Sequence, residues 1–164
     1  MKLKRCALSL LLARLGMAIL LLAAGCSSNL RKPMRGTNSL TGVIEAEIQC
    51  DHWYYDFGES VHIQARLKNV SRKDLVFGNE TVPVMDIRIQ SSPTDAHYWA
   101  QEHSDDVKRL VTLKPGESYT VEWTMTPTSQ AIYGIDAWWT DSEGDRSGMG
   151  TTIFYGVRPP GPLP

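Results

Sequence analysis

Side chains able to do acid–base, nucleophilic or metal chemistry are few in this sequence and widely spaced. The chain contains no Gly-x-Ser-x-Gly nucleophile turn, no His-Glu-x-x-His motif and no phosphate-binding glycine loop. Its histidines lack the close pairing that is typical of zinc ligands; they are His52, His62, His97 and His103. We therefore expect a protein that is not an enzyme, with no catalytic residues, no metal site and no non-covalent cofactor.

An acidic turn is the nearest approach to a cation site. Asp141, Glu143 and Asp145 surround Gly144. An EF-hand needs a twelve-residue loop with a bidentate glutamate at its end, and this segment has neither. We interpret it as a solvated turn between two strands, with a low-affinity cation site as the alternative.

The N-terminus carries the clearest functional signal. Residues 1–25 begin with Lys2, Lys4 and Arg5 and continue as a short apolar stretch interrupted only by Arg14, which is typical of a secretory signal peptide. The stretch ends in Leu-Ala-Ala-Gly-Cys, which resembles the lipobox of bacterial lipoproteins. The resemblance implies cleavage between Gly25 and Cys26 and a diacylglycerol on the Cys26 thiol, hence an extracytoplasmic protein anchored in the cell membrane or the outer membrane.

Removal of the signal peptide changes the charge of the chain. The full sequence has 17 basic and 18 acidic residues; residues 1–25 hold four of the basic residues and none of the acidic ones, so the mature chain has 13 against 18. A mildly acidic protein lacks the basic surface that nucleic-acid binding requires. We expect no nucleic-acid partner.

Processing also changes the cysteine count. Cys6 leaves with the signal peptide and Cys26 is acylated, so Cys50 is the single remaining thiol and no intrachain disulfide can form. Ile44, Ala46, Ile48 and Cys50 alternate with polar residues, which places Cys50 on the inward face of a strand. We predict a buried, inert thiol.

Apolar residues recur with period two through most of the mature chain, as in half-buried antiparallel strands. Turn-forming Gly, Pro and Asn residues separate these segments, and no segment has the pattern of a long amphipathic helix. The clearest segments are residues 44–50, 61–67, 85–89, 119–125, 133–139 and 153–157. The pattern predicts an all-β fold, a single immunoglobulin-like antiparallel β-sandwich of about seven to nine strands.

The ends of the mature chain lack this periodicity. Residues 26–39 are rich in turn formers and are predicted to be a flexible, lipidated tether. Residues 159–164 contain four prolines, which cannot donate to a β-ladder, and are predicted to be a Pro-rich tail. The sandwich is therefore expected to span residues 40–158.

The order of features in this domain resembles the intracellular proteinase inhibitor (BsuPI) family. The matching segments lie within residues 57–140: Gly58-Glu59-Ser60-Val61, Leu67-Lys68-Asn69-Val70-Ser71, Met85-Asp86-Ile87-Arg88-Ile89 and Leu113-Lys114-Pro115-Gly116-Glu117. The resemblance implies an immunoglobulin-like fold and proteinase inhibition through an exposed loop, for which residues 91–106 and 78–83 are the candidates.

Aromatic residues supply the candidate binding surface. Flat exposed rings are what a glycan or a partner protein stacks on, although large rings also fill cores. The candidates are Trp53, Tyr54, Tyr55, Tyr98, Trp99 and Trp138. Trp123 and Trp139 are expected in the core.

Three functions therefore remain open. The first is a non-enzymatic, lipid-anchored envelope protein whose sandwich is a protein-interaction or structural module, with an unknown envelope or extracellular protein as partner. The second is a proteinase inhibitor of the BsuPI type. The third is a module that binds cell-wall glycan through surface aromatics.

Overall fold

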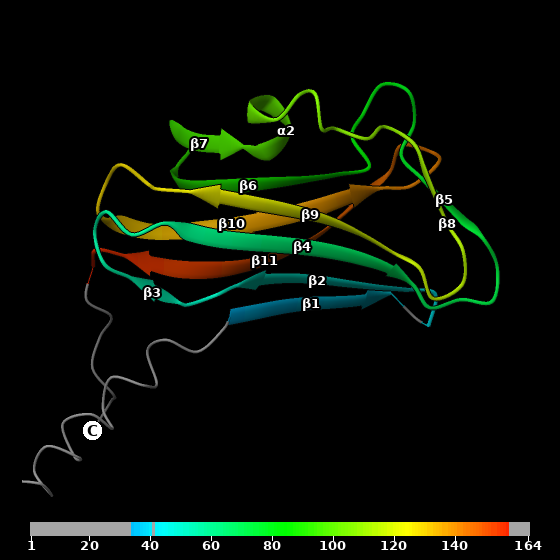
Figure 1. The fold of residues 1–164 in the computed structure, drawn as a ribbon, viewed down its shortest axis with the longest axis horizontal. Coiled ribbons are helices and arrows are strands. Elements are labelled where there is room, and N and C mark those ends of the chain that lie inside the picture. Colours follow the sequence, from blue (N-terminus) through cyan, green and yellow to red (C-terminus); the bar gives the residue numbers. More distant parts are fainter. Residues whose placement is uncertain (1–33, 41, 158–164) are drawn as a thin grey trace, which may run out of the picture. The chain divides into compact units, whose positions relative to one another are not determined.

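The computed structural model describes residues 34–40 and 42–157, and the side chains of residues 34–40 are not described. These residues form the all-β sandwich that the alternation predicted (Figure 1). The predictions for the signal peptide (residues 1–25), for Gly25 and Cys26, and for the Pro-rich tail (residues 159–164) lie outside the described residues. No helix in the described part of the chain has both the length and the apolar character needed to cross a membrane.

The first sheet, sheet A, has four antiparallel strands in the order β1-β2-β4-β9. They are β1 (Met34–Leu40), β2 (Ile44–Cys50), β4 (Val61–Asn69) and β9 (Ser118–Met125). Buried and exposed residues alternate along β4, because one face of the sheet covers the core and the other meets solvent. Its central strand β4 pairs with β2 on one side and β9 on the other.

The second sheet, sheet B, has the order β3-β11-β10-β6-β7. Only β3 pairs in parallel, with β11. The strands are β3 (Tyr54–Tyr55), β6 (Met85–Ser92), β7 (Asp95–Tyr98), β10 (Ala131–Thr140) and β11 (Arg146–Tyr155). A four-residue helix, α2 (Trp99–Glu102), follows β7, and β5 (Leu75–Phe77) pairs with β8 (Val111–Leu113) in a small third sheet.

The inward residues of sheets A and B form one hydrophobic core. Trp123 and Trp139 are buried in it, as predicted, and His62 points outward from β4. The acidic segment forms the predicted turn between β10 and β11, where the Asp141 carboxylate accepts the N–H groups of Glu143 and Asp145, both at 2.9 Å.

Two segments differ from the sequence prediction. β1 lies inside the stretch that was expected to be a tether, so the folded region begins before residue 40. It lacks an apolar period because a strand at a sheet edge can be held by backbone pairing alone, here with β2 over seven residue pairs. The expected extended loop at residues 91–106 is instead the β6–β7 turn, β7 and α2.

Cys50, the last residue of β2, is fully buried, and burial, with a smaller contribution from the Asp51 charge, raises the pKa of its thiol to about 12. We expect Cys50 not to react with a thiol reagent at neutral pH in the native protein and to react fully after unfolding in guanidinium. An exposed cysteine introduced by Leu110→Cys serves as the control, since residue 110 is exposed. Native labelling of Cys50 at the rate of residue 110 would contradict the buried assignment.

Candidate functional site

Two of the six candidate binding aromatics are core residues. Tyr55 is fully buried and Trp99 is 5% exposed, so neither ring can serve as a binding platform. Tyr55 turns inward because it follows Tyr54 in β3, where successive side chains point to opposite faces. Trp99 is covered because α2 folds back against β6.

The other four candidates are partly buried and use their rings in contacts within the domain. The Trp138 ring on β10 meets the Tyr98 ring edge-on at 6.2 Å and lies 5.7 Å from the Arg146 guanidinium. Trp53 meets Phe154 edge-on at 5.5 Å, and the Tyr54 hydroxyl donates to Asp56. These contacts limit the open ring area available for a sugar to stack on.

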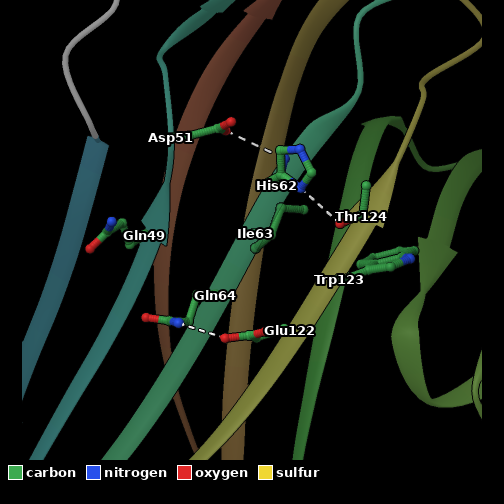
Figure 2. Close-up of a pocket in the computed structure, with 8 residues that line it drawn as sticks. All are labelled: Gln49, Asp51, His62, Ile63, Gln64, Glu122, Trp123 and Thr124. Atoms are coloured by element: carbon green, nitrogen blue, oxygen red, sulfur yellow. Dashed lines mark hydrogen bonds between the residues drawn. The ribbon is translucent and has the colours of Figure 1, made fainter.

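The outer face of sheet A holds a polar pocket of about 260 Å³ (Figure 2). Two cross-strand hydrogen bonds order its side chains. Gln64 Nε2 donates to Glu122 Oε1 at 2.8 Å, and His62 Nδ1 lies 2.8 Å from the Thr124 hydroxyl. Asp51 completes one corner, where its carboxylate accepts the Tyr55 hydroxyl.

This pocket does not assemble a catalytic relay. The Asp51 carboxylate accepts the main-chain N–H of His62 at 3.4 Å rather than a ring N–H, so it does not orient the imidazole as the acid of a nucleophile triad does. Within residues 34–40 and 42–157, no three metal-ligating side chains converge. The pocket offers hydrogen-bonding groups and two carboxylates, those of Asp51 and Glu122, which suits recognition of a polar surface.

A second and larger depression, of about 460 Å³, runs along the free edge of β9. We call it the β9 groove. One wall is residues 118–122 of β9, and the other is the segment from Trp99 to Lys108. His103 and Asp106 complete the wall between Trp99 and Lys108. Glu122 borders both the groove and the polar pocket, so the two form one continuous surface. Figure 1 shows α2 and β7 beyond the β9 edge.

The backbone of β9 points hydrogen-bonding groups into this groove. Asn69, the last residue of β4, donates its N–H to Glu117 on the β9 side, whereas the next residue, Val70, donates its N–H to Val43 on the β2 side. Groups alternate along an antiparallel strand, so the odd-numbered residues of β9 bond to β4 and the even-numbered ones face away. Ser118, Thr120, Glu122 and Thr124 therefore direct their N–H and C=O groups to the edge, where no described strand pairs with them.

A buried carboxylate holds the wall of the β9 groove that runs from Trp99 to Lys108. Asp86 on β6 is 6% exposed, and its Oδ1 accepts the N–H of Ala100 in α2 at 2.9 Å. Burial raises the pKa of Asp86 above its ordinary value. His103 then stacks on Trp99 at 5.4 Å and meets Trp123 of β9 edge-on at 6.5 Å, so the wall is joined to the strand below it by aromatic contacts.

Sequence patterns did not reveal the β9 groove. In an immunoglobulin-type sheet with strand order A-B-E-D, a fourth strand lies beside strand E. Here β2, β4 and β9 have that A-B-E order, and no described strand takes the fourth place. The one available signal was the lack of period-two alternation across residues 99–110, between two strongly alternating strands.

The fold and the open edge define the protein as an immunoglobulin-like antiparallel β-sandwich with a groove along one sheet edge. Comparison with protein-family models and with curated proteins gave no match. Among solved structures, the chain is similar to the sporulation control protein Spo0M from Bacillus subtilis, at 13% identity and a TM-score of 0.46. The match covers 72% of this chain and 51% of Spo0M, so the chain spans about half the length of that protein.

Two other solved structures also match part of the chain. The CARDB domain of the PF1109 protein from Pyrococcus furiosus, solved in complex with di-metal ions, matches at 16% identity and a TM-score of 0.42, over 72% of this chain and 94% of that domain. A β-glucosidase from Listeria innocua matches at 14% identity and a TM-score of 0.38, over 77% of this chain and 16% of the enzyme.

Proposed function

We propose that the mature chain is a lipid-anchored protein of the cell envelope, attached through Cys26, and that its sandwich is a non-enzymatic module that binds another envelope protein. The partner contributes an extended segment that adds to sheet A beside β9. One observation carries this proposal: the unpaired edge of β9 faces a groove that is lined by side chains on both walls. An exposed strand edge is a template for pairing with another chain.

The groove provides for both affinity and selectivity. Four even-numbered residues of β9 offer backbone N–H and C=O groups, which pair with any extended chain regardless of its sequence. The walls add His103, Asp106 and Lys108 on one side and Glu122 on the other, so charges of both signs contact the bound segment. A segment with both acidic and basic side chains fits this arrangement best.

Proteinase inhibition and glycan binding have less support from the geometry. Inhibition by an exposed loop needs an extended segment, yet residues 91–106 fold into β7 and α2. Residues 78–83 form a compact turn in which Asn79 Oδ1 accepts the N–H groups of Thr81 and Val82. The candidate glycan-binding rings are buried or engaged in contacts within the domain.

Replacing Thr120 with proline tests strand addition directly. Proline removes the N–H that points into the groove and leaves the β4–β9 ladder intact, since residue 120 bonds away from β4. With a photo-crosslinking amino acid at Ser118 in cells that make the full-length protein, we expect one discrete protein adduct. Thr120→Pro is expected to reduce its yield about tenfold, because a partner carbonyl loses its donor.

Two controls make this result specific. Thr120→Ala shortens the same exposed side chain but retains the backbone N–H, so it should preserve the adduct. A crosslinker at Thr152, which is exposed on the outer face of sheet B, should not give the same adduct. Equal adduct yields from Thr120→Pro and Thr120→Ala, with matching thermal unfolding, would exclude pairing at β9.

A further inference from the structure

An apolar patch covers one end of the sandwich. Phe57 is 57% exposed and Ile132 is 51% exposed, and what sets them apart from other exposed apolar residues is the aromatic side chains around them. Cross-strand pairing sets Ile132 beside Phe154 and Phe154 beside Tyr54, and the Trp53 ring meets Phe154. We call this set the entry-end patch: Trp53, Tyr54, Phe57, Ile132 and Phe154.

The described chain both begins and ends at this end of the sandwich. Met34, the first residue of β1, pairs with Cys50, three residues before Trp53. At the other terminus, β11 ends at Tyr155, whose ring contacts Phe57 at 6.0 Å. In Figure 1 the start of β1, β3 and the arrowhead of β11 lie together.

The length of the preceding segment ties this end to a lipid anchor. This step rests on the proposed acylation of Cys26. Met34 follows Cys26 by eight positions, and a fully extended segment of that length reaches about 27 Å. The entry end is therefore the part of the domain held nearest to the bilayer. An apolar surface at this end can reach the acyl chains, whereas a polar surface would contact only the lipid head groups.

We propose that the entry-end patch contacts the bilayer interface and orients the domain on the membrane. Trp and Tyr rings favour this interface because each has an apolar body and a polar edge. Phe57 and Ile132 would insert more deeply, since both side chains are fully apolar and more than half exposed. When the entry-end patch contacts the membrane, the strands of sheet A extend away from the bilayer and the β9 groove remains accessible.

The acidic groups beside Phe57 determine which lipid surface suits the patch. The Asp56 carboxylate accepts the Tyr54 hydroxyl at 3.1 Å, and Glu59 Oε2 accepts the Asp56 N–H at 2.9 Å. Asp51 accepts the Tyr55 hydroxyl at the same end. These carboxylates bond within the domain and carry negative charge, so a zwitterionic surface is favoured over an anionic one.

Spin labels on the acylated full-length protein test this orientation. Nitroxides are attached through Phe57→Cys, Ile132→Cys and, as a control at the opposite end, Leu110→Cys, which is 60% exposed in the native chain. Cys50 is buried and Cys26 carries lipid, so each variant has one reactive thiol. In phosphatidylcholine vesicles, we expect the ratio of collisions with oxygen to collisions with a water-soluble nickel chelate to be several-fold higher at residues 57 and 132 than at residue 110.

The outcomes of the spin-label experiment test the orientation and the lipid anchor separately. Labels at residues 57 and 132 that are as water-exposed as the label at 110, on a chain whose mass includes the lipid, would overturn the orientation and leave the anchor intact. Dipolar broadening between labels at residue 57 would show that a second copy covers the patch, which also overturns it. A chain without the acyl mass would overturn the anchor and this inference together.

Discussion

Replacing Asn69 with alanine is expected to lower the free energy of unfolding by about 3 kcal/mol. Asn69 is fully buried at the end of β4. Its Nδ2 donates to the carbonyls of Lys73 at 2.7 Å and Leu113 at 2.8 Å, and its Oδ1 accepts the N–H and hydroxyl of Ser71 at 2.9 and 2.7 Å. Alanine removes these bonds and leaves the buried Leu113 carbonyl without the Asn69 donor.

Urea unfolding followed by tryptophan fluorescence measures this effect, because Trp123 and Trp139 are buried in the core. Asn79→Ala provides a matched control. Asn79 Oδ1 makes the same kind of turn, with the N–H and hydroxyl of Thr81, but at the surface. We expect it to cost less than about 1 kcal/mol, since water replaces the lost bonds. Equal costs for both variants would mean that Asn69 does not join β4 to β8 as described.

The Asn69 site shows what alternation can and cannot predict. Alternation along residues 61–67 correctly identified β4 and its inward face, because a one-residue shift would move every apolar side chain into water. It could not predict the bonds of Asn69, since they reach Leu113, 44 residues away. β1 was not predicted for a related reason. Backbone pairing with β2 holds this strand, and backbone pairing does not produce a pattern of apolar side chains.

The candidate site was less predictable than the fold. The sequence identified the aromatic residues but not whether each ring points into the core or toward solvent. Tyr55 and Trp99 were therefore placed among the binding residues, although they are core residues. The β9 groove depends on a strand missing from one edge, which is a property of sheet order rather than of any residue. The lipobox predicted at Cys26 depends only on local sequence, because signal peptidases read an unfolded segment, and it stays a prediction.

Replacing Cys26 with serine is expected to move the protein from the membrane to the soluble fraction. Each acyl methylene buried in the bilayer contributes about 0.8 kcal/mol, so two or more chains hold a protein almost permanently, whereas a hydroxyl cannot receive the lipid through a thioether. Carbonate washing of membranes followed by mass spectrometry of the chain measures both the location and the modification.

Cys6→Ser is the matched control, because Cys6 lies in the segment that cleavage removes. It should leave both the acyl mass and the membrane location unchanged. A Cys26→Ser protein that resists the carbonate wash and retains residues 1–25 would show that the uncleaved N-terminal segment anchors it instead. A cleaved Cys26→Ser protein that stays on the membrane would contradict anchoring by lipid.

Sheet A has the order β1-β2-β4-β9, so the strand that follows the proposed anchor and the strand proposed to bind the partner are its two opposite edges. Tension between the membrane and a bound partner would therefore pass across the β1–β2, β2–β4 and β4–β9 ladders in series. Sheet B would carry none of this load directly. Under force, the weakest of the three ladders sets the mechanical strength of the link. The β1–β2 and β2–β4 ladders have seven residue pairs each and the β4–β9 ladder has eight, so we expect one of the first two to separate before the strand at the groove is released.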